Sequence, residues 1–193
     1  FNSIILPMLT PMVFDNYHTF PVLMNQILIF GVVTKNASDD VALRKLSFIQ
    51  IPQNLPRFYE IERDDKMIFV PIEDIIKRYL HKLFRNIDIE SINLFRLTRN
   101  GDFTLEESDD IETNFLEELK RKLKTRRTGR VVRIEMDEKP NKWLKKILKD
   151  RWELDEDNFF YVTKDDLFDY TGLWQIINHS HFKDKQPKPV RPV

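Results

Sequence analysis

The residues best suited to chemistry lie at positions 95–102, where a strand-like run carrying two arginines ends in an Asn-Gly pair. Arg96 and Arg99 carry planar guanidinium groups with several N–H donors, which suit a carboxylate or a phosphate. Asn100-Gly101 is typical of a type I′ hairpin turn, because both central residues of that turn need positive φ. Asp102 follows the turn and supplies an acid. The segment therefore predicts a hairpin whose arginines bind an anion or pair with an acidic side chain.

A second candidate is the basic run from Lys120 to Arg127, which continues to Arg130 and Arg133. Its dense positive charge could bind a phosphate chain, nucleic acid or an anionic membrane. The alternative is a solvated helix end, since cations favour the C-terminal end of the helix dipole. No aromatic residues alternate with the cations, which argues against specific binding of single-stranded nucleic acid. The candidates for contact with phosphate or with a protein interface come from these two segments and are Arg96, Arg99, Asn100, Asp102, Arg126, Arg127, Arg130 and Arg133.

The four histidines are weaker candidates. His18 lies three residues after Asp15, so the carboxylate could orient it as a base or a ligand. The simpler interpretation is a histidine that holds a proline-rich corner by hydrogen bonds. His179 and His181 could clamp a metal ion, but the linker-like tail that follows favours adventitious binding. His81 lies off the apolar face of its helix and is expected at the surface. From the four histidines together we predict no catalytic residue and no metal ligand in this chain.

The composition is that of a folded protein without the common motifs of catalysis. The 193 residues are 41% hydrophobic and 12% aromatic, enough for a core in one domain or at most two small ones. Lys plus Arg equals Asp plus Glu at 31 each, so any polyanion site must be a local patch. With four glycines and no cysteine, there is no Gly-rich phosphate loop, dinucleotide motif, disulfide or thiolate site. No apolar run approaches the roughly 20 residues that cross a bilayer, so no transmembrane segment is expected.

Two periodicities indicate the elements that must position these side chains. Short apolar or alternating runs predict strands at residues 28–33, 45–51, 67–70, 89–99, 130–136 and 159–162. Apolar residues at helical spacing predict helices at residues 71–84, 108–123, 140–152 and 163–172. Pro71 is expected at the first helical position, and Thr163 with Asp166 has the spacing of a capping box. Strands and helices do not alternate regularly, so the predicted fold class is α+β with a mainly antiparallel sheet.

Prolines gather toward both ends of the chain. Residues 1–21 combine prolines with apolar residues, which predicts an irregular lead-in packed on the core. Residues 178–193 become rich in proline and cations and are typical of an extended linker. The domain proper is then expected at residues 22–177. Phe1 opens the sequence without a basic leader, which indicates a piece of a longer protein and not a signal peptide.

Five segments match one known pattern in order and spacing across residues 4–177. They are Leu6 to Pro11 with Asp15, His18, Phe20 and Pro21; Ile51-Pro52 with Leu55 to Phe58; Val70 to Ile76 leading to Phe84; Phe95 to Asp102; and Arg126 to Glu135. Together they resemble the middle, or head, domain of the long, histidine-phosphorylating polyphosphate kinases of bacteria. Thr19 and Gly101 depart from that pattern, which more often has proline and a small residue other than glycine there.

The resemblance implies a parent enzyme that moves the terminal phosphate of ATP reversibly onto polyphosphate. That enzyme would use Mg²⁺, pass through a phosphohistidine and act as a homodimer or tetramer. It would lie in the cytoplasm, either free or attached to the surface of the inner membrane. None of the four histidines here matches the family's phosphorylated histidine. This chain alone is therefore expected to be inactive and to hold no cofactor, whereas ATP and Mg²⁺ belong to the parent.

The resemblance also implies a role in subunit assembly and in shaping the polyphosphate path, beside the rest of the kinase chain. The family's head domain is similar in fold to phox-type phosphoinositide-binding modules, so we expect about three antiparallel strands packed with helices. Arg96 and Arg99 are then expected to be structural or interface ion-pair donors, with a polyphosphate contact as the less favoured role. The alternative is a free-standing adaptor that binds a polyanion or a phosphoinositide through the basic run.

Overall fold

The described residues, 1–35, 44–64, 66–100 and 129–186 of a computed structural model, form two units. The sheet unit comprises Thr10–Gln50 and Ile87–Phe168. The hairpin unit comprises Phe1–Leu9, Ile51–Asn86 and Asp169–Val193. Each unit is built from segments far apart in the sequence, so neither core can form from one continuous stretch of chain.

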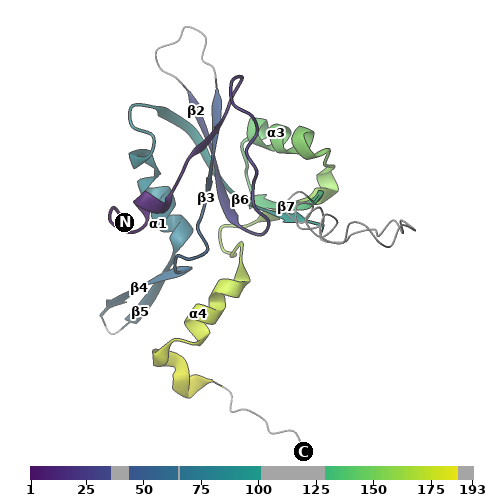
Figure 1. The fold of residues 1–193 in the computed structure, drawn as a ribbon. Helices are drawn as coiled ribbons and strands as arrows, with labels where there is room; N and C mark the ends of the chain where they lie inside the picture. Colours follow the sequence, from purple (N-terminus) through teal and green to yellow (C-terminus); the bar gives the residue numbers. More distant parts are fainter. Residues whose placement is uncertain (36–43, 65, 101–128, 187–193) are drawn as a thin grey trace, which may run out of the picture. The chain divides into compact units, whose positions relative to one another are not determined.

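The sheet unit is built on six strands in the order β1-β3-β2-β6-β7-β8 (Figure 1). Their bounds are Met12–Phe14 for β1, Leu28–Lys35 for β2, Lys45–Gln50 for β3, Asp88–Arg99 for β6, Val131–Asp137 for β7 and Phe159–Val162 for β8. All neighbouring pairs are antiparallel except β7 and β8, which are parallel. A parallel pair cannot be joined by a tight hairpin, and the helix α3, Lys142–Trp152, supplies the crossover.

The strand β2 lies near the middle of the sheet and is buried on both faces. Seven of its eight residues are buried, as its continuous apolar run predicts. Gly31 in this strand allows α3 to approach, since a Cβ there would lie 2.7 Å from Leu144 Cδ2. The small size of glycine therefore serves close packing here and not a turn.

The core of the sheet unit lies between the sheet and α3 (Figure 1). Leu144 and Leu148 of the helix are fully buried against Phe48, Phe95 and Ile134 of the strands. The partly buried residues packed around them are Met12, Phe14, Phe20, Trp143, Ile147 and Trp152. The helix thus presents to the sheet the apolar stripe that its sequence predicts.

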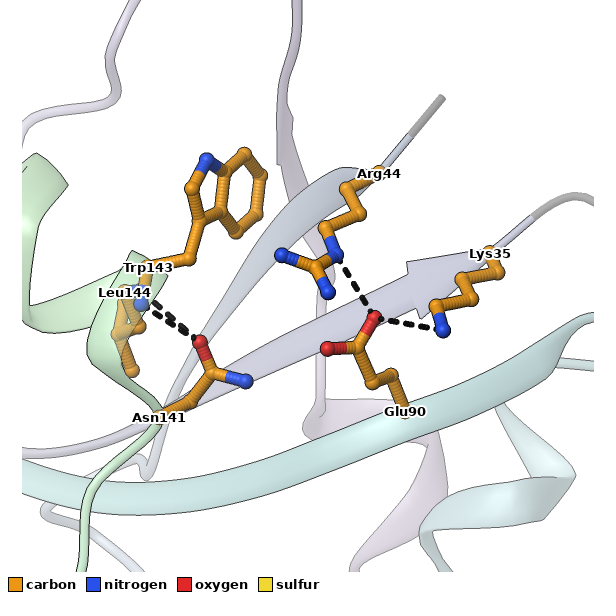
Figure 2. A network of polar contacts seen from close by, with 6 residues as sticks. All are labelled: Lys35, Arg44, Glu90, Asn141, Trp143 and Leu144. Atoms are coloured by element: carbon orange, nitrogen blue, oxygen red, sulfur yellow. Dashed lines mark hydrogen bonds and ion pairs between the residues drawn. The ribbon is translucent and has the colours of Figure 1, made fainter. Parts of the chain in front are cut away.

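Asn141 begins α3 as its N-cap. Its Oδ1 accepts hydrogen bonds from the backbone N–H groups of Trp143 and Leu144 at 3.0 and 3.1 Å (Figure 2). These bonds satisfy donors that have no partner within the first turn of a helix. The backbone N–H of Asn141 itself donates to Oδ1 of Asn93 in β6 at 3.2 Å, which joins the helix start to the sheet.

The hairpin unit pairs β4, Phe58–Arg63, with β5, Lys66–Pro71, in a separate antiparallel sheet. The helix α1, Ile72–Tyr79, follows β5 directly and buries Ile72 and Ile76. The helix α4, Leu173–Ile177, is joined to β4 by the amide of Gln175. This amide accepts from the N–H of Phe58 at 2.9 Å and donates to its carbonyl at 2.7 Å. Short 3₁₀ turns occupy Leu6–Met8, Leu80–Lys82, Glu156–Asn158, Tyr170–Gly172 and Ser180–Lys185.

Most of the predicted elements are confirmed. The strands expected at 28–33, 45–51, 67–70, 89–99, 130–136 and 159–162 are β2, β3, β5, β6, β7 and β8, and the helices expected at 71–84 and 140–152 are α1 and α3. The mixed α+β class with a mainly antiparallel sheet is also found. Pro71, however, is the last residue of β5 and the N-cap of α1, not the first helical residue. The helix predicted at 108–123 and the turn residue Gly101 lie outside the described residues.

Two expectations about the fold were wrong. The main sheet has six strands and not the about three that the phox-type resemblance implied, because the strands expected at 130–136 and 159–162 and the unexpected short strand β1 all join it. The helix predicted at 163–172 is also absent: Thr163 Oγ1 donates to Asp166 at 2.7 Å within a turn, and the helix begins only at Leu173. The sequence analysis also missed β4, whose glutamates and arginine lie exposed in a two-stranded ribbon.

We predict that Asn141→Ala lowers the free energy of unfolding by about 1 kcal/mol, because two N–H groups of α3 lose their acceptor. Asn141→Asp keeps an acceptor at the same position and should retain most of the stability. Urea unfolding followed by tryptophan fluorescence measures both, since Trp143 and Trp152 lie in α3. Equal destabilisation by the two variants would contradict the role of the cap.

Candidate functional site

Arg99 ends β6 and ties together three parts of the sheet unit. Its Nη1 donates to the carbonyl of Gly129 at 2.8 Å and its Nη2 to the carbonyl of Leu23 at 3.0 Å. Its backbone N–H donates to Oδ1 of Asn25 at 2.8 Å. Burial lowers the pKa of Arg99 from its usual value, since desolvation disfavours the charged form. The forked guanidinium therefore fixes the chain on either side of the strand end.

Arg96 points to the other face of the same strand. Side chains alternate along a strand, so residues three apart lie on opposite faces. The Nη1 of Arg96 donates to the carbonyl of Phe168 at 3.0 Å and lies 3.7 Å from the carboxylate of Glu135, its cross-strand partner in β7. The structure therefore does not bring Arg96 and Arg99 together in one anion site.

The remaining described candidates lie where β6 ends and β7 begins. The N–H of Asn100 donates to the carbonyl of Arg130 at 2.8 Å, which extends the pairing of the two strands. The guanidinium of Arg133 stacks over Phe160, 3.9 Å from its ring centroid, and Nη2 lies 2.9 Å from Glu135 Oε1. Asp102, Arg126 and Arg127 lie outside the described residues.

A pocket of about 300 Å³ opens beside the end of β6. Its lining consists of Phe20, Pro21, Val22, Arg99, Gly129, Arg130, Val131, Arg151 and Trp152. Arg151 of α3 lies over Phe20, with Cζ 5.3 Å from the ring centroid, and Phe20 packs edge-on against Trp152 at 5.5 Å. Arg151, Phe20 and Trp152 were not predicted as site residues, because no local pattern in the sequence connects the end of a helix with the end of a distant strand.

The histidines have structural contacts. His18 Nδ1 lies 2.7 Å from Asp15 Oδ1, and this hydrogen bond is the main cause that lowers the pKa of Asp15 in an exposed turn. His179 lies 3.3 Å from Glu60 through Nε2, and its Nδ1 accepts from the N–H of His181 at 3.2 Å. Within the described ranges, no group of three or more His, Cys, Asp or Glu side chains could hold a metal ion.

A buried ion pair organises the hairpin unit. Arg57 forms a two-pronged pair with Glu73 of α1, one contact being Nη2 to Oε1 at 2.5 Å. Burial lowers the pKa of Arg57 from its usual value, whereas the nearby carboxylates of Asp169 and Asp74 raise it. Gly172 packs on the stem of Arg57, where a Cβ would lie 2.3 Å from Cγ. Each residue of this group therefore fixes the position of another.

A third charged group lies at one end of the main sheet. Figure 2 shows the carboxylate of Glu90 in β6 between the ammonium group of Lys35, at 3.4 Å, and the guanidinium of Arg44, at 2.9 Å. Both cations are about half exposed, so this network contributes little to stability at physiological salt. It joins the ends of three neighbouring strands.

The described arrangement can bind an anion, but it holds no set of groups for catalysis. Its arginines donate to carbonyls or stack on aromatic rings, and His18 and His179 lie beside the carboxylates of Asp15 and Glu60. None of these contacts links a nucleophile to a base in the manner of a catalytic triad. No helix of the described residues is long and apolar enough to span a bilayer.

Comparison with known proteins gives one consistent family. A family model described as the polyphosphate kinase middle domain matches residues 1–176. A polyphosphate kinase of Halalkalibacterium halodurans is 34% identical over 182 residues, covering 92% of this chain and 25% of that protein. One of Staphylococcus epidermidis is also 34% identical, covering 100% of this chain and 26% of that protein. This chain therefore spans about a quarter of the length of these relatives.

The fold has a solved counterpart. A crystal structure of polyphosphate kinase from Porphyromonas gingivalis superposes with a TM-score of 0.68 over 100% of this chain and 26% of that one. The two sequences are 15% identical over this alignment, so the likeness establishes the fold alone.

We predict that Arg99→Lys lowers the free energy of unfolding by about 1–3 kcal/mol although the charge is kept. A lysine ammonium cannot reach the carbonyls of both Gly129 and Leu23 in the geometry of the planar fork. The matched control is Arg44→Lys, an exposed site where lysine can still pair with Glu90. Chemical denaturation measures the free energy of unfolding of both variants. An equal loss of stability in Arg99→Lys and Arg44→Lys would contradict the structural role of Arg99.

Proposed function

The chain belongs to the family of polyphosphate kinase middle domains, and from this membership we propose that it is the non-catalytic middle part of a polyphosphate kinase. The whole enzyme in this proposal moves the terminal phosphate of ATP reversibly onto polyphosphate, with Mg²⁺ as cofactor. The observation that carries the proposal is the match of residues 1–176 to the family model, in a chain that spans about a quarter of its relatives. Catalysis then belongs to the remainder of the enzyme.

The proposed role of this part is subunit assembly and shaping of the polyphosphate path. Exposed apolar side chains of the hairpin unit support the first of these roles. Tyr170, Trp174 and Ile177 repeat at helical spacing and are 59%, 63% and 43% exposed. Ile61 and Ile68 face each other across the β4–β5 pair and are both exposed. Large apolar side chains grouped on an exposed surface are typical of protein–protein contact sites.

Several finer features belong to the same proposal. The partners are the rest of the kinase chain and further copies of the enzyme, which we place in the cytoplasm. ATP and Mg²⁺ are held by the remainder of the enzyme, and residues 178–193 serve as a linker to it. The likeness of the fold to phox-type modules also stays a prediction. Family membership gives no support to the alternative of a free-standing polyanion- or phosphoinositide-binding adaptor.

Transfer of label from ATP tests the catalytic part of the proposal. The protein encoded by the complete reading frame and the 193-residue chain alone are incubated with Mg²⁺ and ATP labelled in the terminal phosphate. We expect labelled, acid-insoluble polymer from the longer protein and no acid-labile label on the short chain. Acid-labile phosphate on the short chain, lost in His18→Ala, would show instead that this part is catalytic. A reading frame that adds no further domain would equally overturn the proposal.

Substitution on the exposed stripe tests the role in assembly. We expect Trp174→Glu to reduce the mass of the assembled longer protein in light scattering, because a charge at an apolar contact is costly to bury. Tyr17→Glu is the control, since Tyr17 is 93% exposed and lies in the sheet unit. An unchanged mass for Trp174→Glu, with the fold intact by circular dichroism, would remove this stripe from the assembly surface.

A further inference from the structure

The pocket beside α3, which we name the arginine pocket, collects three arginines from separate parts of the sheet unit. Arg99 ends β6, Arg130 directly precedes β7, and Arg151 lies in the last turn of α3. We propose that the arginine pocket is a binding site for a chain of phosphate groups. The inference rests on the proposed function for the identity of the anion and deepens it by naming the residues that make the contact.

The described lining of the arginine pocket brings no negative charge to its three arginines. None of the described residues that line it is acidic. Within the described residues, the side chains of Arg130 and Arg151 make no ion pair, and both residues are exposed. Like charges gathered in a hollow raise one another's electrostatic energy and focus a positive potential there. All three arginines therefore lower the electrostatic free energy of an anion that enters the pocket.

The walls of the pocket are fixed before a ligand arrives. Both Nη groups of Arg99 are held by backbone carbonyls, so this side chain contributes charge from the wall and not a direct contact. Arg151 rests on the ring of Phe20, which is in turn packed against Trp152. A preorganised site loses less side-chain entropy on binding than a mobile surface patch. Arg130 and Arg151 are then the donors available to the ligand.

The donor set matches phosphate, and the pocket is small. Guanidinium groups form paired hydrogen bonds with phosphate oxygens, a geometry that an ammonium group lacks. A volume of about 300 Å³ is at the lower end of the range for small-molecule pockets. The ring of Phe20 contacts Phe14, Phe48, Trp152 and Arg151, so it has little room to stack a nucleotide base. The pocket therefore favours bare polyphosphate over the triphosphate of a nucleotide.

Calorimetric titration of the 193-residue chain tests this inference, with tripolyphosphate, orthophosphate and ATP as separate ligands at about 0.1 M salt, where the Debye length is about 10 Å. The test variant is Arg130→Gln with Arg151→Gln. The control is Arg44→Gln with Arg63→Gln, which removes the same charge at exposed arginines outside the pocket. We expect the test variant to weaken tripolyphosphate binding at least about tenfold, the effect of losing one good charged contact. The control should change it by less than about twofold, since neither arginine lines the pocket and exposed charges are screened at this salt concentration.

Equal weakening by the two variants, or no binding of tripolyphosphate to the unaltered chain, would overturn the inference. Tighter binding of ATP than of tripolyphosphate would overturn the choice of polyphosphate as the source of the phosphates. The unfolding midpoint of each variant is measured as a control for folding. Because the substituted side chains are exposed, we expect unchanged midpoints, so that the titrations report on binding alone. Polymer synthesis by the longer protein is measured separately, so failure of the pocket and failure of the proposed function are distinguishable.

Discussion

A strand that runs from Leu28 to Val33 without a charged or strongly polar residue must bury both faces, since each large apolar side chain left in water forgoes about 1.5–3 kcal/mol. In the sheet unit β2 lies between β3 and β6, and α3 covers the face of this strand that carries Ile29 and Val33. Gly31 allows the close approach of the helix, and Asn141 fixes where that helix begins. The parallel pairing of β7 and β8 follows, because α3 must return the chain across the sheet between them.

The same sheet decides what its arginines can do. Because side chains alternate along β6, Arg96 and Arg99 are directed to opposite faces and donate to different carbonyls. Arg99 then connects the strand end to the segments at Leu23 and Gly129, and this connection forms one wall of the arginine pocket. Arg130 and Arg151 differ from these two arginines. Among the described residues their guanidinium groups donate to no backbone carbonyl, so they are the arginines available to a ligand.

Several residues that carry the family resemblance have structural roles in this chain. Arg57 and Glu73 lie in two separate segments of the family pattern and form the buried pair of the hairpin unit, with Gly172 packed on the arginine stem. Arg99 belongs to another such segment and holds the end of β6. A family signature can therefore mark the residues that hold a domain together, which is consistent with a middle domain whose enzyme performs catalysis elsewhere.

The sequence by itself determined the family, through five segments in register, and the main local elements, through apolar periodicity: β2, β3, β6, β7, β8, α1 and α3. Only the tertiary structure decided that the main sheet has six strands, that β5 pairs with β4 in a second sheet, and that the last helix begins at Leu173. It also decided that Arg151, and not Arg96, lies beside Arg99. The reason is physical: periodicity reports which face of an element is buried, whereas strand partners and pocket linings depend on groups distant in the chain, whose meeting is fixed by packing.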